Sequence, residues 1–203
     1  MPKETFQNLE QEKKNRILEA AINEFSEQTY ESAKISNIIK EAKIPRGSFY
    51  QYFEDKFDLY NFIFDYIGNQ KMEFMKDLLP NPENMGFLEL FEELYIRGVK
   101  FAKSDPRYVK ISTFLMSGPS NLLKKVFDDK LDYAKQIYID YVNADKALGR
   151  IREEIDSETL ANLLIQVTTN IAVEEVKDGK EIDLNHMLDK IKKFILILKK
   201  GIE

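Results

Sequence analysis

The sequence of 203 residues contains no cysteine and a single histidine, His186. Without cysteine, the chain can form neither a disulfide framework nor a thiolate metal site. A di-iron site in a helical bundle needs two Glu-x-x-His motifs, which one histidine cannot supply. The sequence also lacks a Ser-His-Asp set and a phosphate-binding glycine loop. We therefore expect no catalytic residue, no metal and no cofactor, and we expect that the protein is not an enzyme.

Long apolar runs are missing as well. The longest apolar stretches, around residues 62–67 and 194–198, fall far short of the roughly 20 residues that a membrane-spanning helix needs. Residues 1–28 carry charges throughout and lack the apolar core of a secretory signal. These features predict a cytoplasmic protein without a membrane partner.

Glycine and proline are scarce, with eight and six residues, and fall mostly between long stretches of helical periodicity. No segment alternates with the period of two that strands require. An apolar content of 43 % is enough for one large or two small cores. We predict an all-α fold, with Asp156 and Asp183 as caps of the last two helices. The expected long helices span residues 9–28, 55–79, 84–103, 106–116, 120–147, 156–177 and 183–200, with two short helices between the first two.

The segment 35–56 reads ISNIIKEAKIPRGSFYQYFEDK. Its first part places Ile35, Ile38, Ile39 and Ala42 on one face of a short helix. The residues Lys43, Ile44 and Pro45 suit a tight turn, with proline near the start of the next helix, where its missing N–H costs little. Phe49 and Phe53 are spaced to anchor that second helix in a core. This pattern predicts a helix-turn-helix, in which the second helix enters the major groove of DNA.

The second short helix then has an outward face with the chemistry of DNA recognition. We expect this face to consist of Arg46, Gly47, Ser48, Tyr50, Gln51 and Tyr52. Arginine pairs with guanine and glutamine with adenine, whereas hydroxyl groups donate to phosphate oxygens. Lys56 adds a positive charge for phosphate, and Lys34, Ser36 and Asn37 are further candidate contacts. The alternative is that the aromatic side chains belong to the core and the lysines are merely solvated.

The segment from Arg16 to Leu59 resembles the DNA-binding domain of the TetR family of transcriptional regulators. The resemblance rests on Ile17, Ala20, Ala21, Phe25, Tyr30, Ile38, Ala42 and Ile44, and above all on Gly47-Ser48-Phe49-Tyr50-x-Tyr52-Phe53-x-x-Lys56-x-x-Leu59. It implies phosphate contacts by Tyr50 and Lys56, and base or groove contacts by Arg46, Ser48, Gln51 and Tyr52. It also implies a three-helix DNA-binding domain over residues 1–56, followed by a larger helical effector-binding and dimerisation domain over residues 57–203.

Two positions depart from the family pattern. Ala33 and Lys34 stand where the family usually has a threonine pair, so the cap of the second helix and a phosphate contact are missing there. Lys43 replaces the turn glycine, which is unfavourable if the turn requires a positive φ.

The net charge of −5 argues against a nucleic-acid partner, because such proteins usually carry a basic surface. Residues 1–56 hold nine basic and ten acidic side chains, a net charge of −1. Since charges act over a Debye length of about 8 Å, a local basic face of Lys14, Lys34, Arg46 and Lys56 is sufficient. We expect double-stranded DNA as the partner, with a shallow dependence of binding on salt.

The remaining chain is rich in aromatic residues. Tyrosines and a methionine that converge among helices form pockets for apolar ligands, and the family resemblance implies release from DNA by such an effector. The candidate pocket residues are Phe91, Tyr95, Tyr108, Phe114, Met116, Tyr133 and Tyr138. The alternative is that these side chains are ordinary core.

The last two helices carry apolar stripes that must be buried against something. We expect a homodimer through a four-helix bundle, formed by Leu160, Leu164, Val167, Ile171, Met187, Ile191, Phe194, Ile195 and Leu198. A dimer would place two reading helices about 34–36 Å apart on a pseudo-palindromic operator. The alternative is that both helices close the core of the monomer. We expect a ligand-released repressor; an activator, a ligand-independent regulator and a pure protein-binding adaptor stay open.

Overall fold

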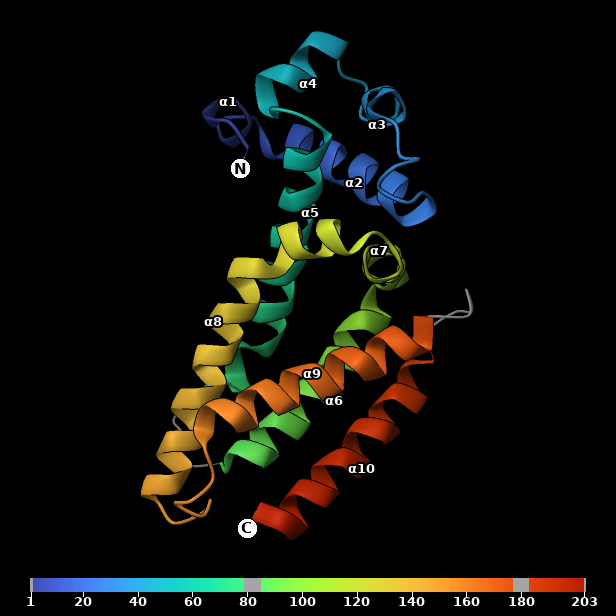
Figure 1. Ribbon diagram of the computed structural model, residues 1–203. Helices are drawn as coiled ribbons and strands as arrows, with labels where there is room; N and C mark the ends of the chain where they lie inside the picture. Colours follow the sequence, from blue (N-terminus) through green and yellow to red (C-terminus); the bar gives the residue numbers. More distant parts are fainter. Residues whose placement is uncertain (1, 79–84, 177–182, 203) are drawn as a thin grey trace. The chain divides into compact units, whose positions relative to one another are not determined.

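The computed structural model describes residues 2–78, 85–176 and 183–202, and within these ranges every regular element is a helix (Figure 1). The all-α prediction is therefore confirmed. The expected helix ends at residues 79, 84 and 177 lie outside the described residues. The elements are α1 (Glu4–Gln7), α2 (Gln11–Glu27), α3 (Ile35–Glu41), α4 (Arg46–Tyr52), α5 (Lys56–Met75), the 3-10 helix η1 (Lys76–Leu78), α6 (Phe87–Ser104), α7 (Pro106–Ser117), α8 (Ser120–Ala147), α9 (Ser157–Val176) and α10 (Leu184–Ile202).

The chain divides into two compact units. The first unit comprises Met1–Met72 and Asp105–Val126, and the second comprises Glu73–Ser104 and Phe127–Glu203. The division does not fall at residue 56, where we expected a domain boundary. Most of α5 and all of α7 belong with the N-terminal helices, and α8 continues from one unit into the other.

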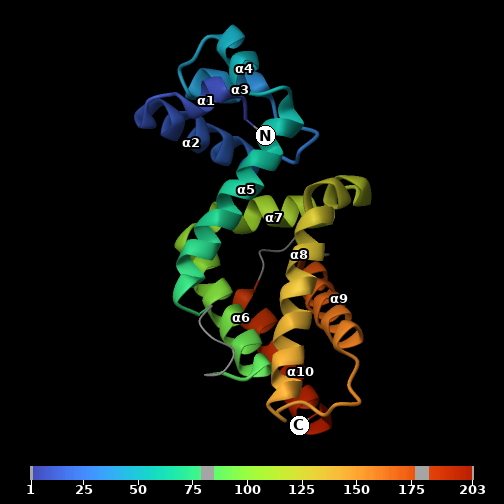
Figure 2. The same cartoon turned by 90° about the vertical axis from the view of Figure 1, so that its left-hand side faces the viewer.

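The core of the first unit is built around aromatic rings on α2, α4 and α5. The buried face of α2 carries Ile17, Leu18, Ala21, Ile22 and Phe25. The ring of Phe25 lies edge-on to that of Tyr60 on α5, with centroids 4.8 Å apart. Figure 2 shows α5 next to the crossing helix α2. This packing fixes α2 as the base on which α3 and α4 rest.

The short helix α1 was not predicted, because four residues show no measurable helical period. It is held by Phe6, which is buried and lies 4.9 Å from the ring of Phe53 and 5.3 Å from that of Phe62. A phenylalanine in a polar segment therefore anchors residues 4–7 to the core.

In the second unit, α6, α9 and α10 lie side by side around a common core (Figures 1 and 2). Asp156 accepts a hydrogen bond from the Thr159 N–H at 2.7 Å, and Asp183 accepts one from the His186 N–H at 3.0 Å. Both expected caps are thus confirmed.

The apolar stripes of α9 and α10 turn inward. Leu160, Leu164, Ile191, Ile195 and Leu198 are all buried in the core that these helices form with α6. Ile171, Met187 and Phe194 are half-buried and pack against the same core, and Val167 is half-buried. The prediction that the five buried residues form a dimer interface is wrong, because their surface is already covered within one chain.

Candidate nucleic-acid interface

Helices α3 and α4 form the predicted helix-turn-helix in the first unit. Ile38 of α3, Ala42 at its C-cap, Ile44 of the turn and Phe49 of α4 are all buried, so both helices are fixed to the core. The turn closes with a hydrogen bond from the Ile44 N–H to the Ile39 carbonyl, at 3.2 Å. Lys43 has φ 53°, the left-handed conformation that glycine adopts without penalty.

The missing threonine cap of α3 is replaced by a carboxylate from α2. No side chain of Lys34 caps the helix, but its backbone N–H donates to Glu24 Oε1 at 2.7 Å. The Asn37 amide donates to both oxygens of the same carboxylate, at 3.2 and 3.1 Å. Glu24 thus puts negative charge at the positive end of the helix. It also holds the Asn37 amide that we expected to face DNA, although Lys34, Ser36 and Asn37 are all exposed.

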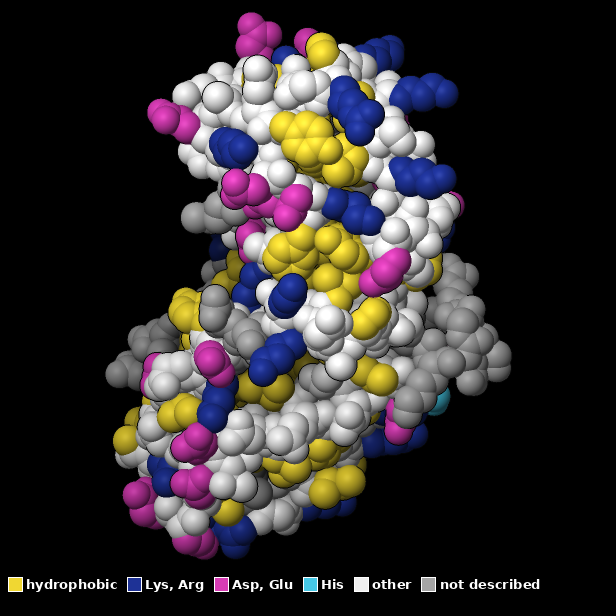
Figure 3. All heavy atoms as spheres, turned by 45° about the horizontal axis from the view of Figure 1, so that its top comes forward, with side chains coloured by type: hydrophobic (Ala, Val, Ile, Leu, Met, Phe, Trp, Pro, Cys, Tyr) yellow, Lys and Arg dark blue, Asp and Glu magenta, His cyan; other side chains and the backbone are white. Residues whose placement is uncertain are grey.

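The outward face of α4 presents most of the predicted contacts. Arg46, Gly47 and Gln51 are exposed, Ser48 is half-buried, and Tyr50 is 47 % exposed. A Cβ added at Gly47 would meet no atom within 4 Å, so another molecule can approach the backbone closely. Figure 3 turns the α3–α4 end of the first unit forward and shows Lys and Arg side chains scattered over it. This face is open to a large polar partner.

The orientation predicted for Tyr52 is wrong. Its side chain is only 5 % exposed, its ring lies 6.1 Å from that of Phe6, and the Lys13 ammonium sits 5.5 Å from the ring centre. Tyr52 therefore faces the core. The sequence contained the signal, because Phe49, Tyr52 and Phe53 follow the spacing i, i+3, i+4 of one helix face.

Lys56 is not available for phosphate either. Its ammonium donates to the carbonyls of Tyr30 at 2.6 Å, Ala33 at 3.0 Å and Glu31 at 3.2 Å, and lies 4.7 Å from the centre of the Tyr30 ring. An ammonium has three donors, and all three are used. The structure assigns Lys56 to holding the turn between α2 and α3.

The candidate effector residues are divided between the two units. Tyr108, Phe114 and Met116 lie on α7 in the first unit, whereas the other four belong to the second. Of those four, Tyr133 is 69 % exposed, and Phe91 is fully buried.

The two remaining tyrosines are core residues of the second unit. Burial raises the pKa of Tyr95 to about 12, although its hydroxyl is hydrogen-bonded to Thr168. Tyr138 packs its ring against Phe87 at 5.7 Å and Phe91 at 5.4 Å. The interpretation as ordinary core fits these two side chains.

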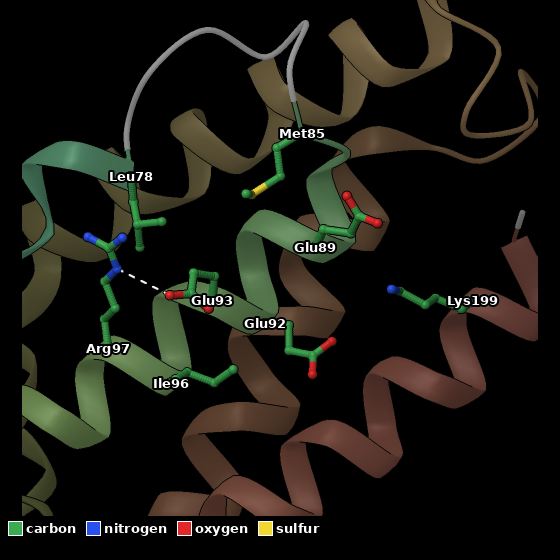
Figure 4. A pocket seen from close by; sticks show the side chains of 8 residues that line it. All are labelled: Leu78, Met85, Glu89, Glu92, Glu93, Ile96, Arg97 and Lys199. Atoms are coloured by element: carbon green, nitrogen blue, oxygen red, sulfur yellow. Dashed lines mark hydrogen bonds and ion pairs between the residues drawn. The ribbon is translucent and has the colours of Figure 1, made fainter.

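The second unit has an open groove of about 460 Å³ beside α6 (Figure 4). Arg97 lines it and bonds Glu93 at 3.2 Å. The other lining residues are Leu78, Met85, Glu89, Glu92, Ile96 and Lys199. None of the candidate effector residues lines this groove, and its charged rim does not suit an apolar ligand.

Within the described residues, no group of three or more histidine, cysteine or acidic side chains is arranged to hold a metal ion. Over the same residues, no helix combines the length and the apolar character that crossing a membrane requires.

Residues 17–62 match the family described as bacterial regulatory proteins, tetR family. The matched segment gives the helix-turn-helix of this chain its similarity to the TetR family. It is 28 % identical over 173 residues to the uncharacterized HTH-type transcriptional regulator YdgC of Bacillus subtilis (strain 168), covering 82 % of this chain and 85 % of YdgC. The matched residues include the whole of α3 and α4.

Solved structures agree with this assignment. A TetR family transcriptional regulator from Chloroflexus aurantiacus J-10-FL is 28 % identical, with a TM-score of 0.63 over 100 % of this chain and 98 % of the other. FadR from Bacillus subtilis, solved in complex with stearoyl-CoA, shares the fold with a TM-score of 0.71 at 18 % identity, over 89 % of this chain and 96 % of FadR. The TetR relatives are transcriptional regulators and not enzymes.

Proposed function

We propose that this TetR-family protein is a repressor that binds a pseudo-palindromic operator in double-stranded DNA as a homodimer and is released by a small, largely apolar effector. The observation that carries the proposal is the divided surface of α4. Phe49 and Tyr52 are buried, whereas Arg46, Tyr50 and Gln51 are exposed on the opposite side. A helix anchored on one face and polar on the other is what a reading helix in the major groove needs.

The exposed side chains fall into two roles. Arg46 and Gln51 have the donors and acceptors to read base edges, guanine and adenine respectively. Ser48 and Tyr50 carry hydroxyls that donate to phosphate oxygens and so fix the register of the helix. Lys34 supplies positive charge from the start of α3.

Contacts between α7 and α2 support a response to an effector. The Arg107 guanidinium donates to Glu19 at 2.8 Å and to Asn23 at 2.6 Å, both on α2. Lys110 adds an ion pair with Glu27 at 3.3 Å. Tyr108, Phe114 and Met116 lie on the same helix, so an effector that touched them would act directly on α2. Coupling between two such sites is typically about 1–3 kcal/mol.

The effector class is supported by two features. The candidate residues on α7 offer aromatic and thioether surface, which suits an apolar molecule. FadR, which shares the fold, is known in complex with stearoyl-CoA, a ligand with a long apolar chain. We therefore propose an apolar chain or ring system as the part of the effector that this protein recognises.

A dimer would use the outward apolar side chains of α9 and α10. Leu163 on α9 is 41 % exposed, and Leu196 and Ile197 on α10 are 52 % and 69 % exposed. The replacement Leu163→Glu is expected to shift the protein to monomers in sedimentation analysis. Leu148→Glu is the matched control, because Leu148 is a similarly exposed leucine outside both helices. If both variants stay dimeric, this face is not the interface.

DNA binding is tested by fluorescence anisotropy with duplexes from the region around the protein's own gene. Gln51→Ala is expected to weaken operator binding about 10-fold, since a good base contact contributes roughly 1–3 kcal/mol. Tyr50→Ala is expected to weaken binding as well. Gln70→Ala is the control, because Gln70 is an exposed glutamine on α5. If the wild-type protein binds no palindromic duplex from this region, the proposed DNA binding is contradicted and a protein-binding adaptor is favoured.

The direction of regulation is tested separately. Deleting the gene in a reporter strain is expected to raise transcription from the operator. A fall in transcription would identify an activator instead.

A further inference from the structure

The C-terminal end of α4 is closed by the N-terminal segment of the chain. A helix leaves its last four carbonyls without partners in the helix itself. In α4, the Phe49 carbonyl accepts from the Phe53 N–H at 2.9 Å. The Tyr50, Gln51 and Tyr52 carbonyls remain, and a seven-residue helix has little stability of its own.

All three of these carbonyls accept hydrogen bonds from residues 3–5. The Lys3 N–H donates to the Tyr52 carbonyl at 2.9 Å, and the Lys3 ammonium donates to the Tyr50 carbonyl at 3.1 Å. The Thr5 hydroxyl donates to the Gln51 carbonyl. Lys3 also places positive charge at the negative end of the helix dipole.

This segment is itself anchored. Phe6 is buried, and its ring contacts those of Phe53 and Phe62 at centroid distances of 4.9 and 5.3 Å. Phe62 lies on α5, so Phe6 ties the segment to the core of the first unit. At its other end, α4 starts from Pro45 without a side-chain cap. The ties that hold the end of α4 therefore come from residues 3–6.

We propose that residues 3–6 form a clamp that sets the position of α4, with Lys3 and Thr5 as positioning residues for sequence-specific DNA binding. The inference rests on the proposed role of α4 in reading DNA. Its physical basis is that base recognition depends on hydrogen-bond geometry in the groove. Non-specific binding depends mainly on charge and tolerates a displaced helix.

Thr5→Val is the sharpest test, because it removes one hydroxyl and changes neither charge nor shape. Operator affinity is expected to fall about 5- to 10-fold, in proportion to one lost hydrogen bond. Affinity for a scrambled duplex of the same length is expected to stay within about 2-fold. Thr5→Ser, which keeps the hydroxyl, restores operator binding. Thr113→Val is the control, since the Thr113 hydroxyl bonds to Val109 of its own helix, α7.

Lys3 is tested by comparing Lys3→Arg with Lys3→Met. The arginine keeps a donor and the charge, so operator binding is expected to be retained, whereas the methionine reproduces the loss seen with Thr5→Val. Hydrogen exchange of the α4 amides provides a readout without DNA. These amides are expected to exchange faster in Thr5→Val, with no change in α7.

The outcomes are distinguishable. Equal losses on operator and scrambled duplexes, together with a lower melting temperature, would overturn positioning in favour of general destabilisation. Unchanged operator affinity and unchanged exchange in Thr5→Val would overturn it outright. If wild-type protein binds no duplex, the proposed function fails, and the exchange of the α4 amides alone decides whether the clamp exists.

Discussion

Two lysines of the first unit act through the backbone of its turns. Lys56 makes three hydrogen bonds to backbone carbonyls of residues 30–33, so its charge holds a turn. Lys43 adopts φ 53° in the turn between α3 and α4. Each position gives a prediction for stability.

Lys56→Met is expected to destabilise the protein by about 2 kcal/mol, because hydrogen bonds to a charged group contribute roughly 1.5–3 kcal/mol. Urea denaturation measures the change. Lys40→Met is the control: Lys40 is exposed on α3, and its loss is expected to cost about 0.5 kcal/mol or less. Unchanged stability together with weaker operator binding would return Lys56 to the role of a phosphate contact.

Lys43→Gly is expected to stabilise the protein by about 1 kcal/mol. The left-handed conformation destabilises an L-residue by about 1 kcal/mol, whereas glycine adopts it without this penalty. Lys43→Ala removes the same charge but keeps the Cβ, so it is expected to bring no gain. Equal melting temperatures for the two variants would show that the backbone conformation is not the cause.

At the scale of elements, the start of α7 combines a cap with an ion pair. Asp105 accepts from the Arg107 N–H at 3.0 Å and from its guanidinium at 3.0 and 2.7 Å. The hydrogen bond to Arg107 lowers the pKa of Asp105 below its ordinary 3.8, and it raises the pKa of Arg107. The same guanidinium reaches α2, so the cap fixes the helix that we propose to carry the effector signal.

Asp105→Asn is expected to cost about 1 kcal/mol at pH 7, the usual loss for a weakened cap. The pKa of Asp105 is lower in the folded protein than the 3.8 of the unfolded chain, so the ionised carboxylate stabilises the fold fully at pH values above 3.8. This stabilisation is lost as the pH falls through the pKa of Asp105 in the folded protein. The difference from wild type is therefore expected to shrink below pH 3.8 in thermal denaturation. Asp132→Asn, at an exposed position on α8, is expected to show little difference at any pH. If the stability difference between Asp105→Asn and wild type is the same at every pH, the ionised carboxylate of Asp105 is not the stabilising group.

At the scale of the whole molecule, the negative net charge constrains how the protein holds DNA. Of the four basic residues expected to face phosphate, Lys56 is engaged by carbonyls, which leaves the exposed Lys34 and Arg46 and the half-buried Lys14. Each helix-turn-helix of the proposed dimer, called a reading head below, can therefore neutralise few phosphates. Hydrogen-bond geometry then has to supply more of the affinity than charge does, and two heads on one operator become necessary.

The salt dependence of operator binding is expected to be shallow. A dimer that neutralises about four phosphates gives a slope of log K against log salt near −4. Lys34→Met is expected to reduce the slope by about 2, one phosphate per head, whereas Lys56→Met leaves it unchanged. Anisotropy titrations at several salt concentrations measure both effects. A wild-type slope near −8 or steeper would contradict the proposed contacts.

Much of the secondary structure was predictable because it depends on local patterns. The starts of α7 and α8 were predicted at the correct residue, where Asp105-Pro106 and Gly118-Pro119 interrupt the helical period. The helix-turn-helix was predictable for the same reason. The inward side of Tyr52 also follows from its spacing to Phe49, and the outward prediction overlooked this spacing.

The sequence by itself determined the helices, the turn at Lys43 and the resemblance of residues 16–59 to the TetR family, because each follows from spacing between near neighbours. Only the tertiary structure decided the partners of Lys56, which lie 23 to 26 residues away, and the ties from residues 3–6 to α4. It also decided that the stripe with Ile191 and Ile195 covers α6 of its own chain. An apolar stripe predicts that a helix face is buried, but it does not predict which element covers that face, because this depends on the packing of the whole chain.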